Sequence, residues 1–115
     1  MHTENLLEKI HRLKSEEKIV GFTSTAGDLL HAGHIAMLAE AKSKCDFLIV
    51  GILTDPTIDR PTIKNKPIQS VFERWMQLQA VSYVDYVLPF ETERDLEDML
   101  YVLMPTIRFV GEEYK

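Results

Sequence analysis

A run of seven apolar residues, Phe47–Leu53, constrains the fold of this chain more than any other feature. The run is far shorter than the roughly 18 residues of a membrane span, and it lacks the alternation of a strand that has one face in water. A continuous apolar segment of this length is typical of a central strand in a parallel sheet that helices cover on both faces. The run therefore predicts an α/β fold.

Shorter patterned segments alternate along the rest of the chain and fit the same kind of sheet. Amphipathic or Leu-rich stretches predict helices, and short apolar runs bounded by turn residues predict strands. The expected helices span Thr3–Lys14, His34–Lys44, Ser70–Val81 and Thr92–Leu103, and the expected strands span Lys18–Thr23, Asp46–Leu53, Asp85–Leu88 and Ile107–Val110. This alternation predicts one domain, residues 1–115, built as a three-layer Rossmann-like α/β sandwich with a parallel sheet and an N-terminal helix within residues 1–16.

Two histidines follow the first predicted strand, in the sequence His31-Ala32-Gly33-His34. At this spacing both imidazoles can project from the first turn of a helix into one site. A helix N-terminus attracts phosphate through its backbone N–H groups and its dipole, and imidazole N–H groups can add hydrogen bonds to phosphate oxygens. The pattern predicts phosphate chemistry at the C-terminal edge of the sheet. The alternative is that one or both histidines only cap the helix or pack in the fold.

The balance of charges and the cysteine content exclude several classes of protein. Eighteen acidic and thirteen basic residues give a formal net charge of −5, which argues against non-specific binding of nucleic acid. The one cysteine, Cys45, excludes an internal disulfide framework and fits a reducing compartment. No apolar run approaches the length of a membrane span, and the first residues do not have the pattern of a signal peptide. We therefore expect a cytoplasmic protein that acts on small molecules, without nucleic acid or membrane as a partner.

The segment from Asp28 to Ile35 closely resembles the signature of the nucleotidyltransferase superfamily that is built around a His-x-Gly-His motif. Similar segments follow in the same order as in that superfamily: Ala41-Lys42, Cys45 to Gly51, Thr54-Asp55, Glu73-Arg74, Tyr83-Val84-Asp85 and Val110 to Glu113. Within the superfamily the chain is most similar to the glycerol-3-phosphate cytidylyltransferases. The resemblance covers about Lys18 to Lys115.

The resemblance implies a reaction in which a substrate phosphate oxygen attacks the α-phosphate of a nucleoside triphosphate and expels pyrophosphate. His31 and His34 would be the catalytic residues that stabilise the developing charge. The implied function is transfer of CMP from CTP to a small phosphorylated alcohol such as glycerol 3-phosphate. Two alternatives stay open: an adenylyltransferase that uses ATP on a sugar or pantetheine phosphate, and a nucleotide-binding module with impaired catalysis. Mg²⁺ is expected with the triphosphate, no protein metal site is expected, and a homodimer is a further expectation.

The resemblance also implies seven further site residues. Those expected at the nucleotide are Ala26, Gly27, Gly33, Lys66, Arg74 and Glu112, and Lys64 is expected at the second substrate. Glu112 could accept a hydrogen bond from the exocyclic amine of cytosine, which adenine also carries. The alternatives are a solvated charged loop for the two lysines and a surface salt bridge for Arg74. Asp28 is expected to bind backbone N–H groups rather than to act as an acid or a base.

Three departures from the family pattern bear on activity. Thr25 stands where a glycine usually lets the loop approach phosphate, and Gly27 replaces an aromatic residue, which predicts a more flexible loop. Ser82 stands where the glycerol-phosphate enzymes usually have an arginine. Family members also continue beyond the position of Lys115, so we expect this chain to lack the C-terminal strand and helix of the family. A fragment, a naturally short protein and a self-associating protein all fit that expectation. Without the C-terminal segment of the family, we expect nucleotide binding to be weak and turnover to be slow.

Overall fold

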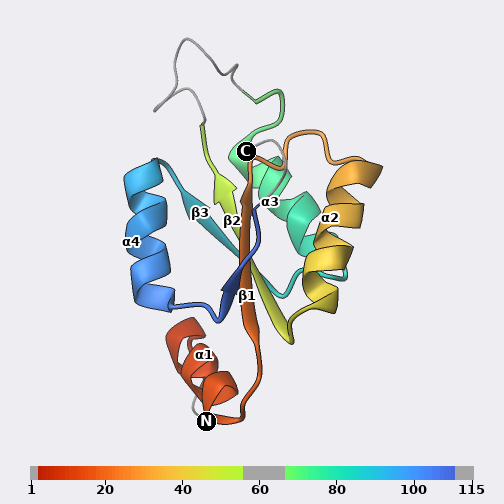
Figure 1. Cartoon of the computed structure of the whole chain (residues 1–115). Coiled ribbons are helices and arrows are strands. Elements are labelled where there is room, and N and C mark those ends of the chain that lie inside the picture. The colour runs from red at the N-terminus through yellow and green to blue at the C-terminus, as the bar shows by residue number, and fades with distance from the viewer. Residues whose placement is uncertain (1–2, 56–66, 111–115) are drawn as a thin grey trace.

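A parallel sheet of four strands forms the middle of the molecule, in the spatial order β3-β2-β1-β4 (Figure 1). The structure is a computed structural model and describes residues 3–55 and 67–110. The strands are β1 (Val20–Thr25), β2 (Phe47–Leu53), β3 (Tyr86–Phe90) and β4 (Ile107–Arg108). β1 pairs with β2 from Val20↔Phe47 to Thr25↔Ile52, and every pair of neighbouring strands is parallel. The predicted parallel α/β fold is confirmed.

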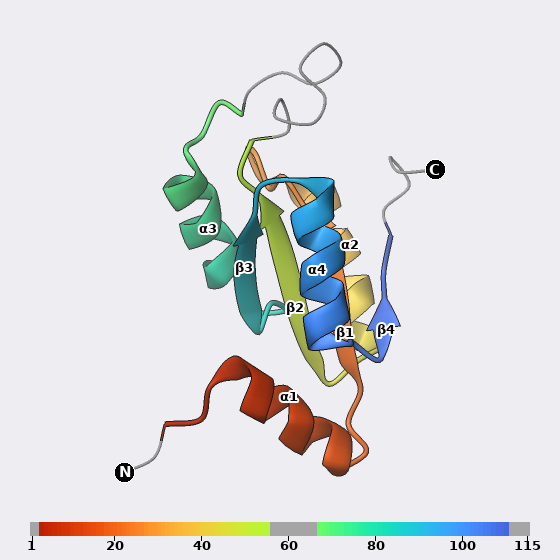
Figure 2. The same ribbon diagram turned by 90° about the vertical axis from the view of Figure 1, so that its left-hand side faces the viewer.

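Helices cover both faces of this sheet and complete the predicted three layers (Figures 1 and 2). They are α1 (Leu6–Ser15), α2 (Ala32–Ser43), α3 (Val71–Ala80) and α4 (Glu93–Leu103). α2 and α3 lie on one face and α4 on the other, as right-handed crossovers require when the chain runs first to one side of β1 and then to the opposite side. α1 packs on the same face as α4, near the N-terminal end of β1.

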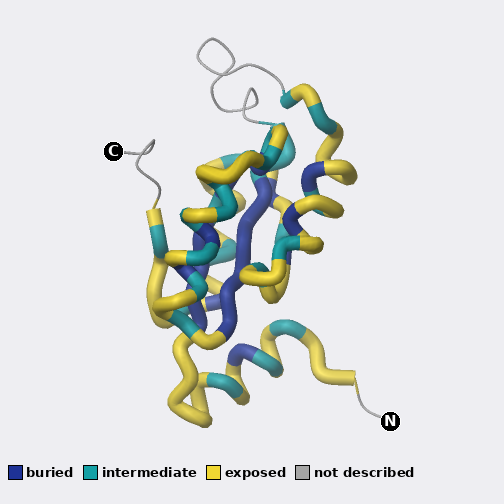
Figure 3. Tube along the Cα trace, turned by 90° about the vertical axis from the view of Figure 1, so that its right-hand side faces the viewer, coloured by how far each residue is buried: buried dark blue, intermediate teal, exposed yellow. Residues whose placement is uncertain are grey.

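Two apolar clusters, one on each face of the sheet, hold these layers together. The cluster beneath α2 and α3 consists of Leu38, Ala41, Leu48, Val50, Ile52, Leu78 and Val87. The cluster beneath α1 and α4 consists of Ile10, Val20, Phe22, Phe47, Ile49 and Leu103. Alternate residues of β2 therefore contribute to opposite clusters, and the buried part of the trace follows the strands (Figure 3). This two-sided burial is why the sequence of β2 is apolar without interruption.

The strand order changes direction beside β1, because β2 and β3 are added on one side of β1 and β4 is added on the other side. The connection through α2 leads from β1 to β2 on one side, and the connection through α4 leads to β4 on the other side. In an open parallel sheet, ligands bind beyond the C-terminal strand ends at such a reversal, because the two connections diverge and leave a crevice. The loop after β1, which carries His31, lies at that edge of the sheet.

The bounds of all four strands differ by one or two residues from those expected; β2 begins at Phe47 rather than Asp46, and β3 is Tyr86–Phe90 rather than Asp85–Leu88. β1 runs to Thr25 rather than to Thr23, because its pairing with β2 continues through Ser24 and Thr25 although both are polar. β4 contains only two residues, and Phe109 adds one further hydrogen bond from its N–H to the Phe22 carbonyl, at 2.8 Å. Within residues 3–55 and 67–110, no helix is both long and apolar enough to span a membrane.

Candidate functional site

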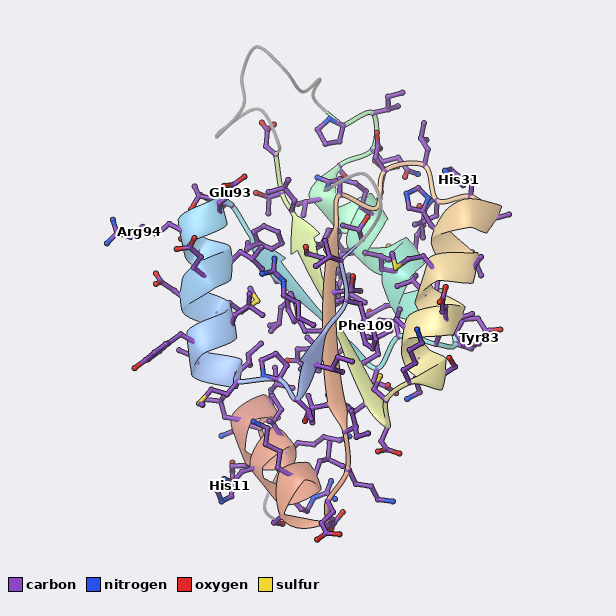
Figure 4. All side chains as sticks on the ribbon, viewed as in Figure 1. His11, His31, Tyr83, Glu93, Arg94 and Phe109 are labelled. Carbon is purple, nitrogen blue, oxygen red and sulfur yellow. The ribbon has the colours of Figure 1, made fainter. Side chains whose placement is uncertain are left out.

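The two histidines lie together at the beginning of α2. His31 is the N-cap residue of the helix, and His34 is the third residue of its first turn. Their ring centroids are 4.2 Å apart and the ring planes are inclined by 49°. His31 is exposed and His34 is half-buried, and Figure 4 shows His31 at the end of α2 that faces the C-terminal strand edge. The structure thus brings both imidazoles to one point on the edge where ligands of such sheets bind.

Hydrogen bonds to the backbone fix the orientation of both rings. The Gly33 N–H donates to Nδ1 of His31 at 3.0 Å, and the His31 N–H donates to Nδ1 of His34 at 3.2 Å. A neutral imidazole that accepts through Nδ1 carries its hydrogen on Nε2. In this tautomer the hydrogen of each ring lies on Nε2, a donor of the kind that a phosphate oxygen accepts. No acidic residue lies in the first turn of α2, so the positive end of the helix dipole is not neutralised there.

Gly33 makes room for the ring of His31. A Cβ atom at this position would lie 2.7 Å from Cε1 and 3.0 Å from Nδ1 of His31, closer than such atoms approach in folded proteins. Any larger residue would push the imidazole away from the helix end and weaken the hydrogen bond that orients it. The glycine between the two histidines is thus a steric requirement of the site.

The loop from β1 to α2 has two residues with left-handed backbone conformation. Gly27 has φ +64° and is buried, with a Cβ position 3.0 Å from Leu78, so no other residue fits without strain. Its N–H donates to Oγ1 of Thr25 at 3.1 Å. The hydroxyl of Thr25 thus binds the backbone of Gly27, and the greater flexibility expected of this loop stays a prediction.

Leu29 is the second left-handed residue, with φ +50°. This conformation costs a non-glycine residue about 1–3 kcal/mol and persists only where surrounding contacts impose it. The Leu29 side chain is 49% exposed, so apolar burial does not explain the conformation. The N–H of Leu29 donates to Oε1 of Gln69 at 2.8 Å, a contact across 40 positions of the chain.

Asp28 links the same loop to the segment that precedes α3. Its carboxylate accepts the N–H groups of Ile68 at 3.0 Å and Gln69 at 2.9 Å. The hydrogen bond from Gln69 contributes most to lowering the pKa of Asp28 below its usual value. The bond from Ile68 and the charge of Arg74 lower this pKa further. The expectation that Asp28 binds backbone N–H groups is confirmed, and the groups belong to a distant segment of the chain.

Arg74 is buried beneath the site, with an exposed fraction of 1%. Its guanidinium donates to four backbone carbonyls, those of Gln69, Ala26, Leu53 and Thr54, at distances of 2.5 to 3.1 Å. Burial lowers the pKa of this group, while nearby carboxylates act in the opposite direction, and the guanidinium remains charged. Arg74 therefore connects the end of β2, the loop after β1 and the beginning of α3. A direct contact between Arg74 and a nucleotide stays a prediction.

The remaining predicted residues divide into those near the histidines and those outside the described residues. Gly33 bonds directly to His31, whereas Ala26 and Gly27 lie earlier in the loop, where the Ala26 carbonyl accepts from Arg74. Lys64, Lys66 and Glu112 fall outside the described residues, so their expected roles stay predictions. Over residues 3–55 and 67–110, no group of three or more His, Cys, Asp or Glu side chains is arranged to hold a metal ion.

Sequence reasoning missed two residues that shape the site, Leu29 and Gln69. No signal marks Leu29, because leucine is disfavoured in the conformation that it adopts here. Gln69 precedes the capping residue Ser70 and has no chemical feature of its own. The burial of Arg74 did have a signal, since it lies four residues before the buried Leu78 on one face of α3.

Comparison with known proteins agrees with this geometry. Residues 22–113, which include the loop, both histidines and all four strands except the first residues of β1, match the model of the family described as cytidylyltransferase-like. The chain belongs to the cytidylyltransferase-like family. It is a nucleotidyltransferase module of the Rossmann-like α/β type.

Curated relatives and solved structures extend the match. The chain is 36% identical over 112 residues to the bifunctional protein HldE of Campylobacter jejuni strain RM1221. The aligned residues make up 97% of this chain and 24% of that protein. HldE of Paramagnetospirillum magneticum is 36% identical over 107 residues, 93% of this chain and 22% of the relative. The chain thus spans about a quarter of the length of these curated relatives.

Two solved structures have a similar fold. The lipopolysaccharide core biosynthesis protein of Thermoplasma volcanium superposes with a TM-score of 0.69 and is 28% identical, over 79% of this chain and 72% of that one. Pantothenate synthetase of Thermus thermophilus superposes with a TM-score of 0.59 and is 17% identical, over 91% of this chain and 51% of that one. The second likeness shows the fold alone.

Proposed function

We propose that the chain catalyses transfer of a nucleotidyl group from a nucleoside triphosphate to the phosphate of a small substrate, with release of pyrophosphate. The observation that carries this proposal is the pair of imidazoles, 4.2 Å apart, at the N-terminus of α2 and at the C-terminal edge of the sheet. Both rings accept backbone N–H groups through Nδ1, and these bonds fix the orientation of the two imidazoles. Membership of the cytidylyltransferase-like family supports the same chemistry.

In the proposed reaction, an oxygen of the substrate phosphate forms a bond to the α-phosphorus while the bond from that phosphorus to the bridging oxygen of pyrophosphate breaks. Negative charge shifts onto the leaving pyrophosphate and is redistributed over the oxygens of the α-phosphate. His31 and His34 donate hydrogen bonds to those oxygens, and the helix dipole adds to the attraction. Mg²⁺ enters with the triphosphate as part of the substrate. Positioning and charge stabilisation supply most of the rate in such transfers.

A phosphorylated sugar or sugar alcohol is the acceptor that we propose. Support comes from the lipopolysaccharide core biosynthesis protein, which is 28% identical and whose name places it in saccharide synthesis. Glycerol 3-phosphate, the acceptor suggested by the resemblance, belongs to the same chemical class. CTP is favoured as the donor by the family description, and ATP remains the second candidate because cytosine and adenine share an exocyclic amine.

The hydrogen bond within the loop bears on the alternative of an impaired nucleotide-binding module. That alternative depended in part on Thr25 and Gly27, which depart from the family pattern. Gly27 is buried in a conformation that glycine adopts readily, and Thr25 accepts its N–H. The two residues that depart from the family pattern are therefore bonded to each other in the folded loop.

The test is an assay of pyrophosphate release with CTP or ATP, in the presence or absence of glycerol 3-phosphate and of a panel of sugar 1-phosphates. We expect acceptor-dependent release, and a decrease of at least about a hundredfold in kcat for both His31→Ala and His34→Ala, since each removes one donor to the transition state. His11→Ala, at an exposed histidine on α1, is the matched control and should leave kcat unchanged (Figure 4).

A binding measurement separates the outcomes. Calorimetric titration of CTP and ATP that detects binding without any turnover would support the binding-module alternative. Absence of both binding and turnover would overturn the proposal. Wild-type turnover in His34→Ala would show that this histidine only caps the helix.

A further inference from the structure

Four hydrogen bonds join the loop that carries the histidines to residues 68–74, the segment that begins α3. The Asp28 carboxylate accepts from the backbone of Ile68 and Gln69, and the Gln69 side chain accepts from the backbone of Leu29. Arg74 completes the set by donating both to the Gln69 carbonyl and to the Ala26 carbonyl. Residues 26, 28 and 29 are thus each held by a group from residues 68–74.

Gln69 is the residue common to these contacts. Its N–H, its main-chain carbonyl and its side-chain oxygen each bind a different partner, at 2.9, 3.1 and 2.8 Å. The side-chain bond is the contact that meets Leu29, whose φ of +50° is unfavourable for leucine. Leu29 precedes His31 by only two residues, so its backbone conformation sets the direction in which the chain enters α2.

We infer that Gln69 is a positioning residue for the two histidines, acting through the backbone of Leu29. The inference depends on the proposed function for its catalytic consequence, and on the geometry of the loop alone for its structural consequence. Without the Gln69 acceptor, Leu29 relaxes towards negative φ, and the N-terminus of α2 with both imidazoles moves relative to β1. Displacements of about 1 Å in a catalytic group lower rates by about a hundredfold.

Simple helix capping does not account for these contacts. Ser70, the next residue, is the N-cap of α3, and its Oγ accepts the Glu73 N–H at 3.1 Å. The helix therefore begins with a complete cap that does not involve the side chain of Gln69. The Gln69 amide instead faces the opposite loop, where its oxygen accepts the N–H of a strained residue.

The experiment compares Gln69→Met, which removes the acceptor with similar volume, with Gln69→Glu, which retains an oxygen at the same reach. Gln79→Met, at an exposed position on α3, is the matched control. For Gln69→Met we expect kcat to fall about ten- to a hundredfold with KM for the nucleotide changed less than about threefold, because the effect is on the transition state. Gln69→Glu should recover most of kcat, and Gln79→Met should leave kcat and KM unchanged.

A second readout needs no activity. The imidazole resonances of His31 and His34, assigned by NMR through the alanine variants, should shift in nucleotide-free Gln69→Met and stay in place in Gln79→Met. Leu29→Gly in the Gln69→Met background should move them back towards the wild-type positions, since glycine adopts positive φ without strain.

These readouts distinguish failure of this inference from failure of the proposed function. Unchanged imidazole resonances in Gln69→Met would overturn the inference whether or not the chain has activity. Shifted resonances in a chain without turnover would support the positioning role and contradict the nucleotidyl transfer. Equal losses of kcat in Gln69→Met and Gln69→Glu, with unshifted resonances in both, would also overturn the inference.

Discussion

α2 and α3 lie side by side on one face of the sheet and begin at the same edge with the same reciprocal capping bonds, yet different residue types form those bonds. α3 begins with Ser70 and Glu73, an oxygen cap followed by an acidic residue. α1 and α4 follow the same rule with Asn5 and Glu8 and with Thr92 and Asp95. α2 instead begins with His31 and His34 and has no acidic residue in its first turn.

The difference shows what each helix end is suited to do. An oxygen cap with a carboxylate stabilises the helix and neutralises its positive end. Histidine is not among the preferred caps, and two imidazoles leave the end without negative charge. The basic residue of α3, Arg74, is also turned inward to backbone carbonyls, whereas His31 and His34 lie at the end of α2 that faces the edge. The N-terminus of α3 thus carries a carboxylate that opposes the helix dipole, and the N-terminus of α2 does not.

The largest expected effect comes from giving α2 the kind of cap that the other helices have. His31→Asp introduces a preferred cap and a negative charge, so the free energy of unfolding should rise by about 0.5–1 kcal/mol. Turnover should fall at least about a hundredfold, because a donor is lost and phosphate is repelled. Urea unfolding and the pyrophosphate assay measure the two quantities on the same protein.

The matched change on a conventional cap should behave in the opposite way. Asn5→Ala on α1 should lower the free energy of unfolding by about 1 kcal/mol and leave turnover within about twofold. If His31→Asp retained turnover, the contrast between the two kinds of helix end would be one of stability alone.

Removal of the Arg74 guanidinium should have the next largest effect, and the quantity it changes most should be the free energy of unfolding. Arg74→Met takes this donor away from the carbonyls of Ala26 and Leu53, which should lower the free energy of unfolding by about 2–3 kcal/mol. Arg74→Lys should be intermediate, since an ammonium cannot reproduce the planar arrangement of donors. Chemical unfolding at constant pH gives both values. A loss of nucleotide affinity with unchanged stability would instead support direct contact between Arg74 and the nucleotide.

The smallest expected effect is a pH dependence that arises from Asp28. Its pKa in the folded chain lies below the ordinary value of about 3.9, so its contribution to stability is present above about pH 4 and is lost as pH falls through the folded pKa. The difference in free energy of unfolding between wild type and Asp28→Asn should be largest near pH 6 and should shrink below about pH 4. Asp98→Asn, at an exposed position on α4, is the matched control. A difference that did not vary with pH would show that the carboxylate charge does not matter.

Much of the fold could be predicted because each element carries its own periodic pattern. Every expected helix and strand is present, with ends that differ by a few residues, and the apolar run of β2 correctly indicated a strand covered on both faces. The position of the histidines at the end of α2 also followed from their place after an apolar strand. The order of the strands did not follow from any local pattern, since it depends on which edges pair.

The contacts within the site were less predictable because they join distant parts of the chain. The bonds of Asp28 to the segment before α3 span about 40 positions, and neither residue type marks the partner. The sequence indicated only that Gly27 permits more conformations than an aromatic residue, and the folded chain places it in the left-handed region beside Leu78. Glycine permits both signs of φ, and only its neighbours select between them.

The sequence by itself determined the alternation of strands and helices, the two-sided burial of β2 and the location of two imidazoles at one helix end. Each of these depends on side chains within a single element, whose spacing fixes the face that they occupy. Only the tertiary structure decided that Arg74 points inward, that Leu29 is held in a strained conformation and that Gln69 lies against it. Those features arise where two loops meet at the edge of the sheet, because the backbone groups of one loop find their partners in the other.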